Sequence, residues 1–145
     1  MSNDVRRPKE HEEMLSALCQ SDRKVFNSYK DALVFAACLG QMRHEKRAFD
    51  KSSEPVGIHI FRGEFDLSIM QCIALAENKD PATMADAKEE SRIRLFEEYA
   101  CGGLDIINRE IYESPEDWDV ALERLMLEAM GGGTRTILED ITSLA

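Results

Sequence analysis

The sequence predicts a mainly helical domain, and three observations lead to this fold class. The first is that apolar residues recur at helical spacing in several segments. The second is that helix start and stop signals separate these segments. The clearest apolar set is Trp118, Ala121, Leu122, Leu125, Met126 and Ala129. The third observation is the composition of the 145 residues, with 43% apolar and 32% charged, which is typical of one globular domain. We expect about five to six helices in a single domain over 1–145, with a flexible N-terminus over 1–8 and a separate C-terminal segment over 131–145.

Two helices are predicted in the first 42 residues. Pro8 fits the first turn of a helix that Ser21-Asp22 ends, with apolar residues at a three-to-four spacing between them. Ser28 then offers an N-cap for a second helix, and Asp31 completes a capping-box pattern. The residues over 29–42 are apolar on nearly every side, so we expect this second helix at the centre of the core.

A short β-hairpin or strand is predicted near residues 47–61. Val56, Ile58 and Ile60 alternate with smaller or polar neighbours after the turn-like segment SSEPVG. A lone strand leaves its backbone donors unpaired. We therefore expect its partner near Arg47–Phe49 or in another copy of the chain.

Glycine, proline and acidic residues divide the second half of the chain into helices. Asp66 caps one helix that ends before Pro81, and a longer helix opens at Thr83 or Asp86. Gly102-Gly103 is expected to end that helix, and a brief amphipathic helix follows it. The last clear helix begins at the signal Ser114-Pro115-Glu116-Asp117 and ends at the glycines over 131–133. A marginal helix through Ile137, Leu138, Ile141 and Leu144 is expected at the C-terminus, where it would dock on a partner.

Charge is distributed unevenly along the chain. Residues 1–62 carry 11 Lys and Arg against 9 Asp and Glu, whereas residues 63–145 carry 7 against 19, for a net charge of −10. Acidic surface repels nucleic acid, so any DNA contact is expected in the first half. The segment over 41–51, QMRHEKRAFDK, is the strongest basic cluster, and its plain interpretation is a solvated loop that offsets the acidic half.

The sequence contains no apolar run long enough to span a membrane, and the start MSNDVRRPKEHEE lacks the apolar core of a signal peptide. We therefore expect a cytoplasmic protein. The four cysteines, Cys19, Cys38, Cys72 and Cys101, form no CxxC pair and are expected to be buried free thiols.

Candidate catalytic and metal-binding residues are few. His11, His44 and His59 lie at no metal-ligand spacing, so we expect neither a metal nor another cofactor. The pairs Glu89-Glu90 and Glu97-Glu98 are expected on solvated helix faces. A metal-dependent nuclease would need converging carboxylates and a lysine. The residues near the predicted hairpin that would have to fill this role are Glu45, Asp50, Lys51 and Glu54.

Four segments carry a resemblance to a known family. They are RPKEHE over 7–12, YKDALVFAACLG over 29–40, PVGIHIF over 55–61 and FEEYACGGLDII over 96–107. Together they resemble a small accessory protein family found with bacterial DNA phosphorothioation (Dnd) defence and restriction gene clusters. The resemblance implies a system that replaces a nonbridging phosphate oxygen of DNA with sulfur and uses this mark to spare self DNA while restricting invading DNA. It assigns no catalytic residue.

Three hypotheses for function follow. The first is a non-enzymatic accessory or regulatory protein of a phage-defence system, which contacts proteins of the same gene cluster, or a second copy of itself, through its acidic C-terminal half or the 43–51 loop. The second is direct DNA binding, with phosphates contacted by Arg6, Arg7, Lys9, Arg43, Lys46, Arg47 and Lys51. The third, ranked last, is the small metal-dependent nuclease.

Overall fold

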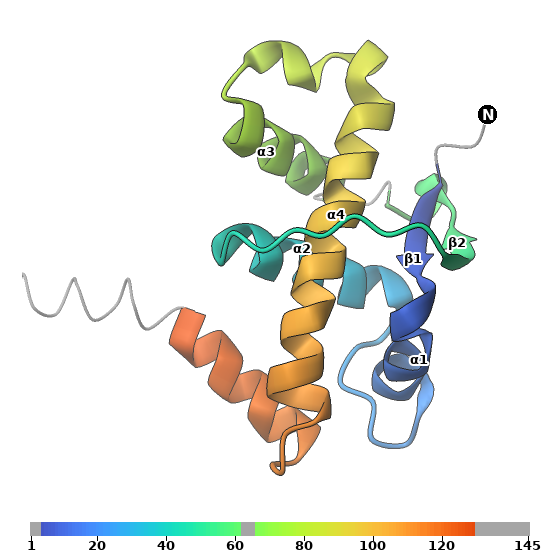
Figure 1. The fold of residues 1–145 in the computed structure, drawn as a ribbon, viewed down its shortest axis with the longest axis vertical. Helices are drawn as coiled ribbons and strands as arrows, with labels where there is room; N and C mark the ends of the chain where they lie inside the picture. The colour runs from blue at the N-terminus through green and yellow to red at the C-terminus, as the bar shows by residue number, and fades with distance from the viewer. Residues whose placement is uncertain (1–3, 62–65, 130–145) are drawn as a thin grey trace, which may run out of the picture.

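The computed structural model describes residues 4–61 and 66–129, and it confirms a mainly α fold with a small two-stranded sheet (Figure 1). The strands are β1 (Val5–Pro8) and β2 (Ser52–Val56), and the α-helices are α1 (Glu12–Gln20), α2 (Tyr29–Met42), α3 (Asp66–Asn78) and α4 (Glu89–Ile107). A further helix covers 118–129. Short helical turns connect these elements: η1 (Lys9–His11), η2 (Ile58–Phe61), η3 (Pro81–Met84), η4 (Asp86–Lys88) and the π-helical η5 (Asn108–Tyr112).

The longest helix, α4, forms the centre of the molecule. Helix α2 crosses one side of α4, and the segment over 43–51 crosses the opposite side (Figure 1). Twelve of the 19 residues of α4 are buried, whereas α2 buries 6 of its 14 and leaves Cys38 and Met42 exposed. The expectation that the helix over 29–42 is the central one was therefore wrong, because its apolar residues pack mainly on the single face that meets α4.

Three glycines allow this close crossing. A Cβ on Gly103 would lie 1.7 Å from the carbonyl oxygen of Ala36, and one on Gly40 would lie 2.3 Å from the carbonyl oxygen of Tyr99. A Cβ on Gly102 would lie 2.1 Å from the carbonyl oxygen of Glu45. Gly102-Gly103 therefore do not end the helix as predicted. They lie inside α4, where the absence of side chains lets two other backbones touch it.

The turn after α2 directs the chain across α4. The Glu45 amide donates to the Gly40 carbonyl (2.8 Å) and the His44 amide donates to the Gln41 carbonyl (3.2 Å), which is the hydrogen-bond pattern of a Schellman motif. His44 takes the left-handed position of that motif, with φ 57°. The Arg47 amide then donates to the Glu98 carbonyl of α4 (3.0 Å), so the backbone of the segment is fixed to the helix.

The sheet differs from the prediction in position and in partner. Strand β1 pairs antiparallel with β2, with Val5 opposite Val56 and Pro8 opposite Ser52. The predicted strand over 56–61 is instead largely the 3-10 turn η2, and the partner of β2 is the N-terminal segment, not Arg47–Phe49. Residues 5–8, which we expected to be flexible, are thus a strand with Val5 fully buried.

The helix over 118–129 begins four residues after Ser114, where the predicted start signal opens. Ser114 accepts a hydrogen bond from the Glu116 amide within the preceding turn, and the Asp117 carbonyl accepts from the Ala121 amide at the helix start. Ala121 and Leu125 are buried, but Met126 and Ala129 are exposed, so the predicted inward stripe reaches the core only in its first half. The predicted stop over 131–133 and the predicted helix through Leu138 lie outside the described residues.

The other predicted boundaries agree more closely with the structure. Asp66 begins α3, which ends at Asn78 as predicted. The helix expected to open at Thr83 or Asp86 starts as the turns η3 and η4 and becomes α4 at Glu89. No helix within 4–61 and 66–129 is long and apolar enough to cross a membrane.

The glycine crossing generates a stability prediction. In an ordinary helix, Gly→Ala stabilises by up to about 1 kcal/mol, but Gly103→Ala must force the Ala36 backbone away. We expect it to lower the free energy of unfolding by about 2 kcal/mol or more, measured by urea denaturation. Gly57→Ala is the matched control, because the three atoms nearest to its Cβ all belong to the movable His59 ring, and it should cost less than about 1 kcal/mol. A Gly103→Ala protein as stable as the wild type would show that the crossing is looser than described.

Candidate functional site

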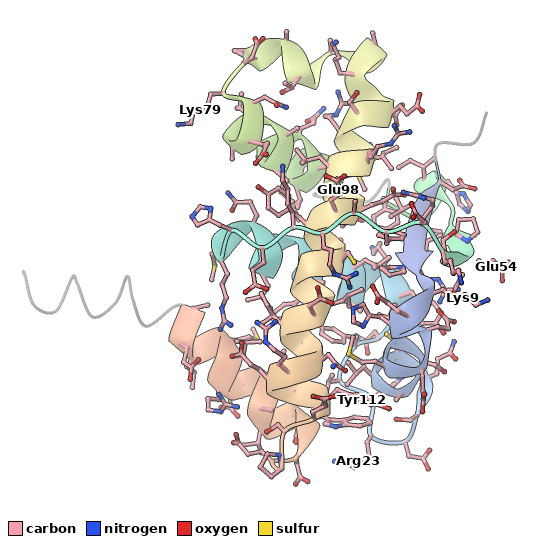
Figure 2. The ribbon with its side chains drawn as sticks, viewed as in Figure 1. Lys9, Arg23, Glu54, Lys79, Glu98 and Tyr112 are labelled. Carbon is pink, nitrogen blue, oxygen red and sulfur yellow. The ribbon has the colours of Figure 1, made fainter. Side chains whose placement is uncertain are left out.

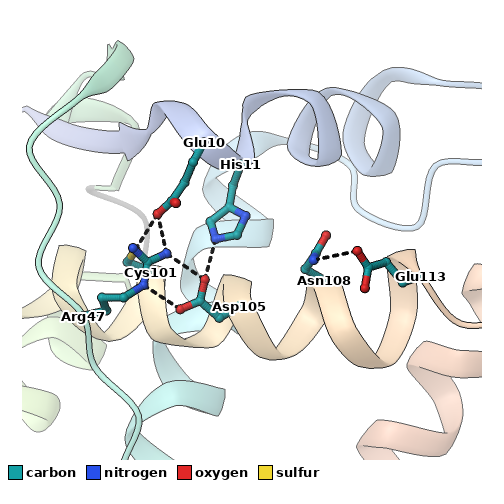
Figure 3. Close-up of polar contacts among 7 residues, drawn as sticks. All are labelled: Glu10, His11, Arg47, Cys101, Asp105, Asn108 and Glu113. Atoms are coloured by element: carbon teal, nitrogen blue, oxygen red, sulfur yellow. Dashed lines mark hydrogen bonds and ion pairs between the residues drawn. The ribbon is translucent and has the colours of Figure 1, made fainter.

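Three residues of α4 form a polar stripe that the N-terminal segment and the 43–51 segment cover. Glu97, Cys101 and Asp105 are spaced four residues apart, which places them on one face of the helix. Arg6 of β1, the turn η1 and Arg47 lie over this face, and Figure 3 shows the part of it around Cys101 and Asp105. We call Glu97, Cys101 and Asp105 the α4 stripe.

Arg47 joins two carboxylates at the lower end of the stripe. Its Nε donates to Asp105 Oδ2 (2.8 Å) and its Nη2 donates to Asp105 Oδ1 (2.7 Å), a bidentate pair. The same Nη2 forms an ion pair with Glu10. His11, which is buried, places its Nε2 2.7 Å from Asp105 Oδ1. An imidazole and a guanidinium from two distant segments therefore converge on Asp105, and Arg47 links Asp105 to Glu10 (Figure 3).

The surroundings of Asp105 and Arg47 favour their charged forms. Burial opposes ionisation of Asp105, but hydrogen bonds from Arg47 and His11 outweigh it and hold the pKa of this carboxyl below its ordinary value of 3.8. The hydrogen bond to Asp105 raises the pKa of the Arg47 guanidinium, against the effect of its partial burial, and the bond to Glu10 adds to this. The pair is thus ionised at neutral pH.

Cys101 is a thiol in an apolar and acidic setting. Its side chain is fully buried, and its Sγ lies 3.9 Å from Glu10 Oε1. Burial raises the pKa of this thiol to about 12, and the nearby Arg47 lowers it too little to compensate. Such a thiol is almost wholly protonated at neutral pH, so it is a poor nucleophile as it stands.

Glu97 forms the upper end of the stripe, and its position overturns a prediction. Its side chain is only 4% exposed, whereas we expected Glu97-Glu98 on a solvated face. Arg6 donates to this carboxylate three times, from its backbone amide (2.7 Å), Nε (3.1 Å) and Nη2 (2.9 Å). A buried carboxylate is tolerated because these charge-assisted bonds replace its water. Sequence reasoning missed it because the cation lies 91 residues away.

The basic residues that we singled out from the sequence are mostly in internal ion pairs. Arg43 pairs with Glu110, and Lys46 donates to Glu77 (2.5 Å), which also accepts from the Tyr99 hydroxyl (2.5 Å). Burial and the Glu77 carboxylate raise the pKa of Tyr99 to about 12. Carboxylates of η5, α3 and α4 therefore neutralise Arg43, Lys46 and Arg47 of the 43–51 loop.

The remaining three candidates lie near the sheet. Arg7 is buried, donates to Glu12 (2.6 Å) and stacks on the Tyr29 ring at 4.2 Å. Lys9 and Lys51 are joined by a backbone hydrogen bond (3.0 Å), and both side chains are exposed. Figure 2 shows Lys9 at the edge of the molecule beside Glu54. Within the described residues, neither ammonium group forms an ion pair, so these two are the candidates most open to a ligand.

The acids considered for a nuclease do not form a metal-ligand group. Glu45 pairs with Arg109 (3.3 Å), and Asp50 and Glu54 are exposed. The structure instead brings together Glu10, His11 and Cys101, whose ligand atoms all lie within 4.8 Å of one another. Over 4–61 and 66–129, this is the only group of three or more such residues with that geometry.

Two of the four cysteines differ from the prediction of buried thiols. Cys19 and Cys101 are buried, but Cys38 and Cys72 are exposed, because each lies on the outward side of its helix. Burial raises the pKa of Cys19 to about 11. All four are free thiols.

Comparison with protein families identifies the chain. A family model described as DNA sulphur modification system-associated protein 4 matches residues 4–139, which is nearly the whole chain. The chain belongs to this family, and the resemblance deduced from the four sequence segments is confirmed. Comparison with curated proteins and with solved structures gives no match.

The lowered pKa of Asp105 generates a prediction about acid stability. Asp105→Asn removes a charge partner of Arg47, so we expect it to lower the free energy of unfolding at pH 7 by about 2 kcal/mol. A carboxyl whose pKa is lower in the folded state stabilises the protein above its unfolded pKa and loses that contribution as pH falls through its folded pKa. The difference from wild type should therefore be full above about pH 5 and shrink below about pH 4.

Urea denaturation at several pH values measures this difference. Asp22→Asn is the control, because Asp22 is an exposed carboxylate and should change stability by no more than about 0.5 kcal/mol at any pH. An Asp105→Asn difference that is small at pH 7, or that grows as the pH falls, would contradict the ion pair.

Proposed function

We propose that this member of the DNA sulphur modification-associated family is a non-enzymatic accessory protein that acts by binding other proteins of its system, a phosphorothioation-linked restriction and phage-defence system. The family description supplies the association with the modification system.

The observation that carries the proposal is an apolar surface on the helix over 118–129. Val120, Met126 and Leu127 are 47%, 45% and 60% exposed, and they lie on the helix over 118–129, whose apolar stripe reaches the core only in its first half. Beside them is a groove of about 450 Å³. Its lining residues are Lys24, Val25, Asp119, Leu122, Glu123, Met126 and Leu127. Single exposed apolar side chains are ordinary, but several around one groove with a charged rim are typical of a protein-binding surface.

The state of the buried polar groups supports binding over catalysis. The best placed thiol, Cys101, has a pKa raised to about 12, and His11 is engaged by Asp105. A nucleophile needs a lowered pKa or an adjacent free base. The carboxylates that meet Arg6, Arg43 and Arg47 are likewise engaged in ion pairs.

Affinity purification from the native host tests the proposal. The tagged protein is purified with nuclease treatment, and the recovered proteins are identified by mass spectrometry. We expect stoichiometric recovery of proteins encoded in the same gene cluster that survives the nuclease. Leu127→Asp should abolish this recovery, because it places a charge in the apolar surface.

Ile60→Asp is the matched control, because Ile60 is 46% exposed but lies on η2, away from the 118–129 helix. It should leave recovery unchanged. Loss of recovery in both variants, or in neither, would contradict the assignment of this surface. Size-exclusion chromatography of wild type and Leu127→Asp shows whether a second copy of the chain occupies the surface instead.

Direct DNA binding is the second candidate, and the exposed Lys9 and Lys51 are the observation that favours it. Because five of the seven candidate cations are held in internal ion pairs, we expect fluorescence anisotropy to detect no DNA binding at physiological salt. Binding that falls steeply with salt and is lost in the Lys9→Ala/Lys51→Ala double variant would overturn the accessory proposal in favour of DNA binding. Lys79→Ala, at an exposed lysine directly after α3, is the control.

A further inference from the structure

We propose that Glu10, His11 and Cys101 form a binding site for a divalent transition metal, with zinc as the best match, which fastens η1 to α4. The three residues come from two segments about 90 positions apart, and no two of them are spaced as in a known metal-binding motif. Their ligand atoms nevertheless converge within 4.8 Å (Figure 3).

The ligand chemistry selects the type of metal. A thiolate, an imidazole and a carboxylate together suit zinc, whereas calcium and magnesium require oxygen ligands. In a tetrahedral zinc site, a sulfur at about 2.3 Å and an oxygen at about 2.0 Å from the ion are separated by about 3.5 Å. The Cys101 sulfur and Glu10 Oε1 are 3.9 Å apart, so a small side-chain adjustment brings them to that separation.

The charges of the site balance when the metal is bound. A thiolate of Cys101 and the carboxylate of Glu10 supply two negative charges against the two positive charges of the ion. Arg47 then keeps its bidentate pair with Asp105 and gives up only its contact with Glu10. The thiol proton leaves to solvent as the metal binds, which makes affinity rise with pH.

Residues around the ligands have the arrangement of outer supports in metal sites. Asp105 Oδ1 lies 2.7 Å from His11 Nε2, so a metal bound at Nδ1 keeps this hydrogen bond as an outer support, whereas a metal bound at Nε2 replaces it. Cys101 and His11 are buried, while the Glu10 side chain is 51% exposed and leaves a path from solvent to the site. Arg47, which bridges Glu10 and Asp105, is the cation that a metal would replace at Glu10.

Cobalt binding tests the site directly. The full chain is freed of metal with a chelator and titrated with Co²⁺ alone, since a cobalt–thiolate bond gives a near-ultraviolet charge-transfer band and tetrahedral cobalt gives visible bands. We expect both bands to saturate at one ion per chain and to disappear when Zn²⁺ is added. Absence of a thiolate band in the wild type would overturn the proposal.

Variants assign the ligands. Cys101→Ser should abolish the thiolate band, while Cys38→Ser, at an exposed cysteine, should retain it. The opposite pattern would show adventitious binding to surface thiols. Because Cys101 is buried and its variant could fail to fold, Glu10→Gln provides a second test at a half-exposed position. It should weaken Zn²⁺ binding more than tenfold in a competition titration, and unchanged affinity would contradict the site.

Discussion

The close contact of two other backbones with α4 is the constraint on which the rest of the structure depends. At Gly40 and Gly103 the helices α2 and α4 approach until backbone touches backbone, and at Gly102 the segment after α2 lies directly on α4. Any side chain at these three positions would separate the layers. The Schellman turn at His44 and the hydrogen bond from the Arg47 amide to Glu98 follow from this contact, because both require the chain to remain within hydrogen-bond reach of α4.

The same contact brings cations of the first half of the chain beside carboxylates of the second half. Cations of the first half, Arg6, Arg43, Lys46 and Arg47, meet carboxylates of the second half at Glu97, Glu110, Glu77 and Asp105. Exposed pairs such as Lys46–Glu77 contribute little to stability, and Asp105 contributes more because it binds both Arg47 and His11. Glu97 differs, because its carboxylate is almost fully buried and loses its solvation if Arg6 is removed. The basic loop therefore serves the fold first, and the excess of acid in the second half provides its counter-charges.

The sequence predicted the helical class, the N-cap at Ser28 and the limits of α3, because these depend on local spacing and local hydrogen bonds. The sequence also indicated the family, through segments such as FEEYACGGLDII. It did not predict the role of Gly102-Gly103, since the same dipeptide is a common helix stop and only a neighbouring backbone distinguishes the two uses. The pairing of β1 with β2 and the meeting of His11 with Cys101 and Asp105 depend on contacts across 44 to 94 residues, which no local pattern encodes.

An accessory role is consistent with this construction, because the molecule commits its charged groups to its own packing and leaves one helix, over 118–129, with an apolar surface open. Amide hydrogen exchange of the wild-type protein, measured by NMR, tests whether the 43–51 segment is held on α4. We expect the Glu45 and Arg47 amides, which donate to Gly40 and Glu98, to exchange at least tenfold more slowly than unstructured amides. Exchange of both amides at the unprotected rate, with the amides of α4 still protected, would show that the segment is not fixed to the helix.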